Sequence, residues 1–214
     1  KSNTREAAAA VTGGMYDRGR DDSPYMGLYH STILQEAFNL RARESFGIKV
    51  VEKAPDAPKL IIDKGDLPKN GRPREIPIRN DHQRQVLREA REFAKSQGWW
   101  SLIPPEYSLT EWKNFAYSAL NEIREAVGHL EFHFHGERHY YAHERFQGLW
   151  QEKTGEGLQC PAVMGLDMKE WREYAFNATG LSMDQIKEID REIRLEISEE
   201  LGHSRVDVTR YYLG

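Results

Sequence analysis

Apolar residues recur every three to four positions over most of this chain, which is the spacing of an amphipathic helix. The clearest case covers positions 182–201, where Ser182 and Gln185 form a capping box and Gly202 ends the pattern. Its apolar face consists of Met183, Ile186, Ile189, Ile193 and Ile197. The same spacing predicts helices at 31–46, 81–97, 109–127, 138–150 and 168–177, and a short last helix that begins at Ser204 with a second box to Asp207.

The pattern changes in the first third of the chain, where β-branched residues gather in short runs. The runs IKVVE, KLIID and REIPI predict strands at 48–52, 59–63 and 74–78. The last two are joined by a stretch rich in Gly, Pro and Lys, which is typical of a hairpin loop. We expect an irregular lead-in at 1–23 and a loop at 155–165. The chain should therefore be α+β and mainly helical, with a small three-stranded antiparallel sheet near its N-terminal side.

Composition indicates a globular protein of one larger domain or two small ones. The 214 residues are 39% hydrophobic and 30% charged, and no apolar run approaches the roughly 20 residues of a membrane span. The first residues lack the apolar core of a signal peptide, so we expect a cytoplasmic protein with no membrane partner. The single cysteine, Cys160, cannot form an internal disulfide and suits a reducing compartment.

The charge of the chain is unevenly distributed. A net charge of −4 counts against a uniformly basic nucleic-acid binder. However, positions 72–91 are rich in arginine, whereas positions 184–200 are mostly acidic. One face of the protein can therefore be basic although the whole chain is acidic.

The last residues, LGHSRVDVTRYYLG, contain two adjacent tyrosines. A random tyrosine pair would be part of a core. Here the pattern is more specific, and it resembles the C-terminal motif of the tyrosine recombinases, the phage-type integrases. The matching residues are Leu201, Gly202, His203, Ser204, Thr209 and Tyr212. In that family the tyrosine nine residues after the histidine is the nucleophile, which corresponds to Tyr212, with Tyr211 as its structural neighbour.

Three further motifs of the same family occur in the family's order. The stretch HGERHYYAH resembles H-x-x-R-H and contains His135 and Arg138. NLRARES resembles G-L-R-x-x-E, with Arg41 and Glu44 in place and Asn39 where the family has glycine. The hairpin DKGDLPKNGRPREIPI resembles the family's lysine-bearing turn, and it supplies Lys64, Arg74 and Pro77. The resemblance covers positions 31–212.

The resemblance implies a site-specific DNA recombination or integration activity. Arg41 and Arg138 would clamp the scissile phosphate, and Lys64 would protonate the departing 5′ oxygen. His135 and His203 would position the phosphate and help to move the proton of Tyr212, which forms a 3′-phosphotyrosine intermediate. The resemblance implies double-stranded DNA as partner, a tetramer on DNA, no cofactor, no metal, and a bacterial, phage or mobile-element gene.

The resemblance also predicts the domain organisation. Positions 1–24 would be a lead-in and 25–214 the catalytic domain, and the family's N-terminal core-binding domain would be absent from this chain. Arg138 and His203 are further apart than the corresponding family residues. The region 152–182 is therefore a possible insertion that touches DNA or a neighbouring subunit.

Other interpretations remain open from the sequence. The chain can be an inactive relative that binds DNA without cutting it, or a purely relaxing enzyme of the topoisomerase IB type. A further alternative is a metal-dependent hydrolase, because His135, His139 and His143 are spaced to line up on one helical face. Cys160 is the only residue that can add a thiolate ligand. Taken singly, Arg41 with Glu44 is an ordinary helix ion pair and Lys64 a solvated turn residue.

Overall fold

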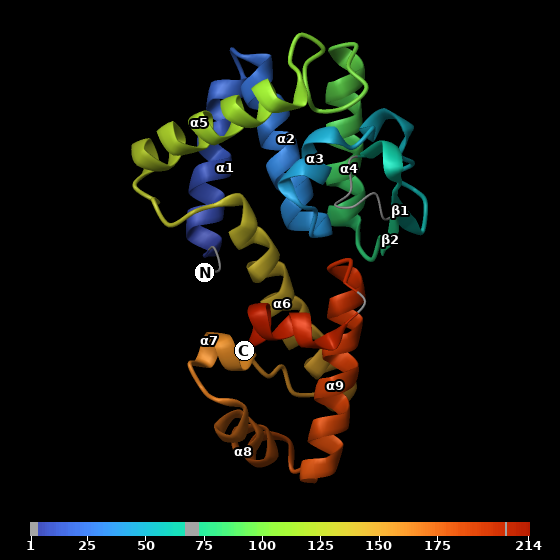
Figure 1. Cartoon of the computed structure of the whole chain (residues 1–214), viewed down its shortest axis with the longest axis vertical. Coiled ribbons are helices and arrows are strands. Elements are labelled where there is room, and N and C mark those ends of the chain that lie inside the picture. The colour runs from blue at the N-terminus through green and yellow to red at the C-terminus, as the bar shows by residue number, and fades with distance from the viewer. Residues whose placement is uncertain (1–3, 67–72, 204) are drawn as a thin grey trace. The chain divides into compact units, whose positions relative to one another are not determined.

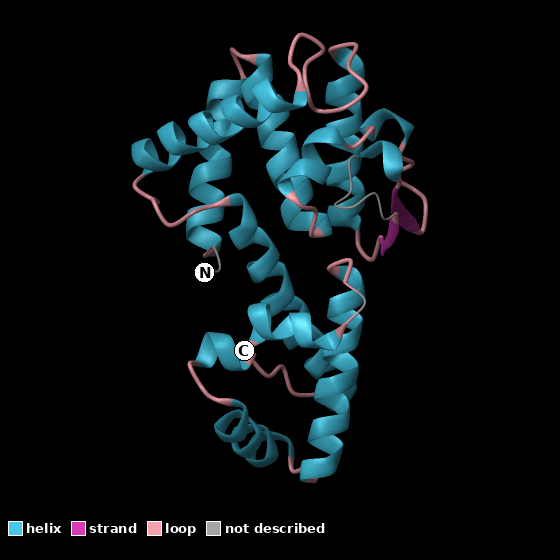
Figure 2. Ribbon diagram, in the orientation of Figure 1, coloured by secondary structure: helices cyan, strands magenta, loops and turns pink. Residues whose placement is uncertain are grey.

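The computed structural model describes residues 4–66, 73–203 and 205–214, and these form two compact units. Unit 1 is Lys1–Arg138 and unit 2 is His139–Gly214. Helices dominate both units, and the described residues contain one two-stranded sheet (Figures 1 and 2). None of the described helices is long and apolar enough to cross a membrane.

Unit 1 is built around helix α2, which packs against α1 and α4 (Figure 1). One apolar cluster joins α2, α4 and the sheet, and a second joins α1, α2 and α5. The strands are antiparallel, with Leu60 opposite Ile76. Its elements are α1 (Arg5–Gly19), α2 (Ser23–Phe38), α3 (Ala42–Gly47), η1 (Val50–Glu52), β1 (Lys59–Ile62), η2 (Lys64–Asp66), β2 (Arg74–Pro77), α4 (Asp81–Ser96) and α5 (Leu109–Val127), followed by the start of α6 (Phe134–Thr154).

Three expectations for unit 1 are wrong. The expected lead-in is helical over α1, whose Ala7, Val11 and Met15 are buried in the core. The expected strand at 48–52 is a 3₁₀ turn, so the sheet has two strands and not three. The helix expected at 31–46 is interrupted after Phe38 and resumes as α3.

The lost strand has a tertiary cause. The main-chain N–H of Lys49 donates to Oδ1 of Asp66 at 2.8 Å, and the N–H of Val50 donates to the carbonyl of Ile48 at 2.7 Å. Because these main-chain N–H groups are already hydrogen-bonded, they are not available to pair with a neighbouring strand. The β-branched residues that suggested a strand instead insert into the core, where Ile48 and Val50 are fully buried.

Unit 2 packs helices around two large tryptophans, Trp150 and Trp171, and the apolar face of α9. The α9 prediction is confirmed: Ser182 caps the helix, and its Oγ accepts from the N–H of Gln185 at 3.3 Å. A short helix, α7, lies inside the expected 155–165 loop. The proposed box at Ser204 lies outside the described residues. The remaining elements are α7 (Pro161–Met164), α8 (Met168–Thr179), α9 (Met183–Glu200), η4 (Val206–Thr209) and α10 (Arg210–Leu213).

A buried ion pair stabilises the turn after β1. Nζ of Lys53 lies 2.5 Å from Asp66, and both side chains are almost inaccessible to solvent. We expect Asp66→Ala to lower the free energy of unfolding by about 3 kcal/mol, because it leaves a buried ammonium poorly compensated. Glu75→Ala is the matched control, since it breaks the exposed Lys59–Glu75 pair of the same hairpin and should cost less than about 1 kcal/mol. Chemical denaturation followed by fluorescence measures both; equal losses would contradict the prediction.

Candidate functional site

Three arginines of unit 1 gather around two acceptors, and we call them the arginine cluster: Arg41, Arg74 and Arg138. Nη1 of Arg138 donates to the carbonyl of Asn39 at 2.6 Å. Nη2 of Arg74 donates to the same carbonyl at 3.1 Å and to Oε2 of Glu44 at 2.8 Å. Nη1 of Arg41 donates to Oε1 of Glu44 at 2.8 Å. Two predicted site residues, Arg41 and Arg138, therefore belong to one hydrogen-bonded network.

Glu44 is the anion at the centre of this cluster. Besides the two guanidinium groups, its carboxylate accepts from the main-chain N–H of Arg41 at 2.8 Å, at the start of α3. Burial alone would raise the pKa of Glu44, but Arg74 and Arg41 outweigh it and hold that pKa below its ordinary value. Glu44 is thus ionised at neutral pH. Arg41 and Arg74 both bond this carboxylate, and guanidinium groups are well suited to bind the oxygens of an anionic ligand.

The conformation of Asn39 explains why α2 ends there. Asn39 has φ +54°, in the left-handed region, and it is the only described residue other than glycine with a positive φ. Glycine and asparagine adopt this region most readily. Asn39 stands where the tyrosine recombinases have glycine, and after glycine, asparagine is the residue that adopts a left-handed conformation most readily. The turn aims the Asn39 carbonyl at Arg74 and Arg138.

We expect Asn39→Ala to be less stable than Asn39→Gly by about 1 kcal/mol. Both variants remove the same polar group, but alanine must take up a left-handed conformation that glycine adopts without strain. Urea denaturation of the two variants side by side measures this difference. A more stable alanine variant would show that the backbone at this position relaxes out of the left-handed region.

His135 lies near the cluster, in the first turn of α6. Partial burial and then the positive charge of Arg138 lower the pKa of His135, and Arg41 contributes in the same direction. The imidazole is therefore neutral at pH 7. A neutral imidazole carries one donor and one acceptor nitrogen, so it can both contact an anion and take up a proton.

Lys64 begins a short 3₁₀ turn, η2, directly after β1. The turn packs against α3, for which Arg41 is the N-cap residue. Asp63 and Asp66 flank the lysine, and the N–H of Asp63 donates to Asp66 at 2.9 Å. The side chain of Lys64 is exposed. Lys64 thus stands at the base of the β1–β2 connection, and the rest of that connection, 67–72, lies outside the described residues.

In unit 2, His203 occupies the corner that ends α9. Gly202 takes φ +72°, and the main-chain N–H of His203 donates to the carbonyl of Ser198 at 2.8 Å. The Ser198 hydroxyl in turn donates to the carbonyl of Arg205 at 2.8 Å. The predicted helix stop at Gly202 is confirmed, and the corner fixes the backbone on which His203 is carried.

The two adjacent tyrosines have opposite environments. Tyr212 is buried (5% exposed) in the core of unit 2, whereas Tyr211 is 68% exposed. The ring of Tyr212 lies 4.8 Å from that of His139 and 6.4 Å from that of His203, measured between centroids. The rings of His203 and Tyr212 therefore lie near each other in unit 2, with Tyr212 buried in its core.

His143 supports α10 from α6. Its Nε2 donates to the carbonyl of Tyr212 at 2.8 Å, which fixes the proton on that nitrogen. Burial lowers the pKa of His143, so the ring is neutral at pH 7. The zinc alternative gains no support, because no group of three or more His, Cys, Asp or Glu in the described part of the chain is arranged to hold a metal ion.

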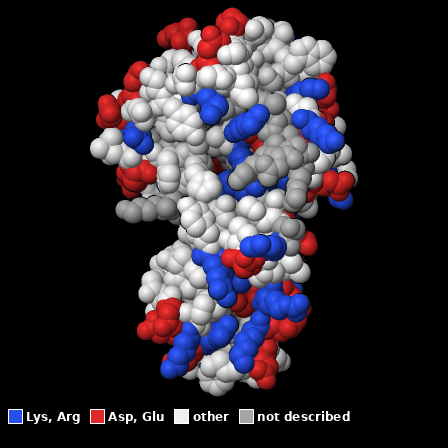
Figure 3. All heavy atoms as spheres, in the orientation of Figure 1, with Lys and Arg blue, Asp and Glu red and all other residues white. Residues whose placement is uncertain are grey.

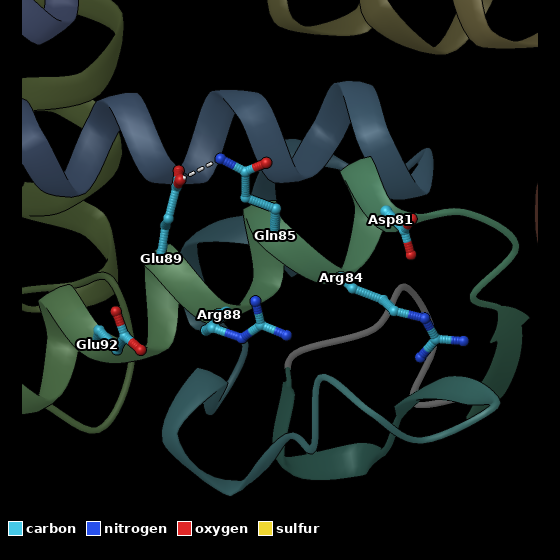
Figure 4. Close-up of a pocket in the computed structure, with 6 residues that line it drawn as sticks. All are labelled: Asp81, Arg84, Gln85, Arg88, Glu89 and Glu92. Carbon is cyan, nitrogen blue, oxygen red and sulfur yellow. Dashed lines mark hydrogen bonds between the residues drawn. The ribbon is translucent and has the colours of Figure 1, made fainter.

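A pocket on α4 contains none of the six predicted site residues. Its walls carry charges of both signs, and Nη1 of Arg84 is engaged by the carbonyls of Pro55 and Ala57 at 3.0 and 3.2 Å. Gln85 also bonds Glu89 at 2.8 Å, as Figure 4 shows. We therefore assign this pocket on α4 a structural role and not a ligand-binding one. It is lined by Asp81, Arg84, Gln85, Arg88, Glu89 and Glu92.

The six predicted residues divide between the units. Arg41, Lys64, His135 and Arg138 belong to unit 1, and His203 and Tyr212 to unit 2. Arg41, His135 and Arg138 lie near one another in unit 1, and the rings of His203 and Tyr212 lie near each other in unit 2, whereas Lys64 is exposed on a turn that packs against α3. Comparisons with models of protein families, with curated proteins and with solved structures found no match.

The sequence does not assign functional roles to Arg74 or to Glu44, the carboxylate that the arginine cluster surrounds. Arg74 belongs to the hairpin that resembles the family's lysine-bearing turn, with no role of its own, yet it shares both acceptors with the predicted arginines. From the sequence, Glu44 is an ordinary ion-pair partner of Arg41, yet in the structure it joins Arg41 to Arg74. The only signal for these two residues in the sequence is their position in motifs that resemble those of the family. The contact between Arg74 and Glu44 joins residues 30 positions apart, so local spacing does not predict it.

Proposed function

We propose that this chain cleaves and rejoins double-stranded DNA as the catalytic part of a tyrosine site-specific recombinase or integrase. The observation that carries the proposal is the arginine cluster, in which Arg41 and Arg138 belong to one hydrogen-bonded network with Arg74 and Glu44. The sequence motifs of both units add to it. The proposal includes assembly as a tetramer on two DNA sites and a mobile-element origin of the gene.

The proposed chemistry begins with attack by the Tyr212 hydroxyl on the scissile phosphorus. The bond from the tyrosine oxygen to phosphorus forms as the bond from phosphorus to the 5′ oxygen breaks. The phenol proton passes to a neighbouring base, with His203 as the candidate, since its ring is near that of Tyr212. Lys64 supplies the proton that the 5′ oxygen needs as it leaves. The products are a 3′-phosphotyrosine and a free 5′ hydroxyl.

The arginines act on the transition state. Negative charge develops on the non-bridging oxygens of the five-coordinate phosphorus, and guanidinium groups stabilise such oxygens through paired N–H donors. Glu44 contributes by holding Arg41 and Arg74 in fixed positions before DNA binds. Donors that are oriented in advance need no reorganisation during the reaction. Rejoining reverses these steps, with the 5′ hydroxyl of another strand as nucleophile, and needs no ATP.

Trapping the covalent intermediate tests the proposal. A nicked duplex that carries DNA flanking the gene loses its short 5′-hydroxyl fragment after cleavage, so the protein stays attached. We expect a DNA-linked band on a denaturing gel. Binding without an adduct on any such substrate would favour the non-cutting relative, and relaxation of supercoiled DNA without strand exchange would favour the topoisomerase-like enzyme.

We expect Lys64→Ala to slow cleavage about 10²-fold, as loss of a general acid does. A substrate with sulfur in place of the bridging 5′ oxygen should restore the rate, because a thiolate leaves without a proton. Single-turnover cleavage measures both effects. Lys69→Ala is the matched control from the same β1–β2 connection. If sulfur rescues only the Lys69 variant, the acid is Lys69 and the assignment to Lys64 is wrong.

A further inference from the structure

Unit 2 contains an open pocket of about 500 Å³ between α8, α9 and the η4–α10 segment. Its size is in the range of small-molecule sites, but such sites have mostly apolar walls, and the walls here are mainly charged. Five cations and two carboxylates line it, which leaves an excess of three positive charges. The charged residues are Arg172, Lys187, Asp190, Arg191, Arg194, Asp207 and Arg210.

The two carboxylates are already occupied. Both oxygens of Asp190 accept from Nε of Arg194 at 2.9 Å, and Nη1 of Arg194 donates to the carbonyl of Gly214 at 2.9 Å. Asp207 pairs at 2.6 Å with Arg205, which is not part of the lining. Arg172 lies close enough to Asp190, and Arg210 to Asp207, for its charge to favour a lower pKa of the carboxyl, but each carboxylate has its direct ion pair with another arginine.

Arg172 provides a second observation that points to a ligand. Its Nε is shielded from solvent and has no hydrogen-bond partner among the described residues. Buried polar atoms in proteins are nearly always paired, and an exception calls for an explanation such as a bound ion. Arg172 lies on α8 and Arg210 on α10, and neither forms an ion pair within the described ranges.

Two other cations of the pocket, Lys187 and Arg191, can bind a ligand with little loss of stability. Lys187 pairs with Asp184 at 3.1 Å and Arg191 with Glu188 at 3.2 Å, along the exposed face of α9. Solvent-exposed pairs of this kind contribute little to stability. An incoming polyanion can therefore take over both side chains without a large loss. Figure 3 shows Lys and Arg side chains spread over the visible face of unit 2 among acidic ones.

We propose that this pocket binds phosphate groups of a DNA backbone, in addition to the phosphate that reacts. Four of its five cations are arginines, whose planar fork matches two phosphate oxygens at once. Identifying DNA as the polyanion rests on the proposed function. The pocket gives a role to α8, which belongs to the stretch 152–182. It also includes Arg210, two positions before Tyr212 on α10, so a phosphate held here touches the element that carries the proposed nucleophile.

The test compares two double variants in the full chain, both in a Tyr212→Phe background so that no cleavage occurs. The pocket variant is Arg172→Gln with Arg210→Gln. The control is Lys153→Gln with Lys169→Gln, which removes the same charge from unit 2 outside the pocket. DNA affinity is measured for each protein over a range of salt concentrations, on a duplex with flanking DNA. Thermal unfolding followed by circular dichroism confirms that each variant is folded.

We expect the pocket variant to bind about tenfold more weakly at low salt. Its plot of log affinity against log salt should be shallower by about 1 to 2, because each phosphate contact contributes about 0.9 to the slope. The control should keep the slope of the parent. Equal slopes for the pocket variant, the control and the parent would overturn the proposal.

Two outcomes separate this proposal from the proposed function. Pocket-dependent DNA binding in a protein whose Tyr212 parent forms no covalent adduct supports the pocket and rejects strand cleavage. A covalent adduct in the parent together with unchanged binding by the pocket variant rejects the pocket alone. If the pocket variant instead loses self-association in sedimentation while keeping its DNA affinity, the proposal is overturned and the pocket takes an acidic segment of a second copy.

Discussion

Tyr212→Phe should abolish the covalent DNA adduct, whereas Tyr211→Phe should retain it. The change removes only the hydroxyl that attacks phosphorus and keeps the ring that fills the core of unit 2, where Tyr212 is buried. Loss of the nucleophile in an enzyme that uses covalent catalysis costs several orders of magnitude in rate. A denaturing gel of the nicked-substrate reaction gives the result directly.

Tyr211→Phe is a closely matched control for this experiment. It makes the same chemical change one residue away, on a side chain that is 68% exposed. Fragmentation of the DNA-linked peptide in a mass spectrometer assigns the modified tyrosine independently. If the adduct survives in the Tyr212 variant and disappears in the Tyr211 variant, the exposed tyrosine is the nucleophile and the motif-based assignment is wrong.

Arg138→Lys should slow single-turnover cleavage about 10³-fold. Lysine keeps the positive charge but loses the fork with which Arg138 donates to the Asn39 carbonyl and, in the proposed reaction, to the phosphate. Arginines that stabilise the transition state of phosphoryl transfer contribute at least that much. DNA binding should change far less than the rate, since the charge remains.

Arg124→Lys controls for structural damage. Arg124 is a partly buried arginine of unit 1 that also donates to a main-chain carbonyl, that of Phe132 at 3.3 Å, but it is not in the arginine cluster. We expect this variant to cleave at the parent rate. A similar rate loss in both variants, or a loss below tenfold for Arg138→Lys, would argue against a transition-state role.

Much of the helical framework is predictable because its causes are local. The range 109–127 is predicted with the bounds that α5 has, and 182–201 differs from α9 by one residue at each end. Both helices begin with a capping box and carry a continuous apolar face. The break at Asn39 was missed because the apolar pattern continues through it, and only the turn geometry of the folded chain ends α2 there.

The residue types of the candidate site were likewise available from the sequence, but their arrangement was not. Local motifs identify Arg41, Arg138, His203 and Tyr212 as a set worth examining. They do not indicate that Glu44 links Arg41 to Arg74, because that contact depends on how a strand docks near α3. Nor do the motifs indicate which of Tyr211 and Tyr212 is buried. A helix of only four residues is too short to show an apolar periodicity in the sequence.

The sequence by itself determined the helices with clear caps and periodicity, the two strands of the hairpin, and the order of the motifs that suggest DNA strand transfer. Tertiary structure decided the 3₁₀ turn at 50–52, the burial of Tyr212, the arginine cluster and the cationic pocket of unit 2. The division follows from the range of the forces involved. Capping and periodicity act within a few residues, whereas side-chain hydrogen bonds and burial join residues that only the folded chain brings together.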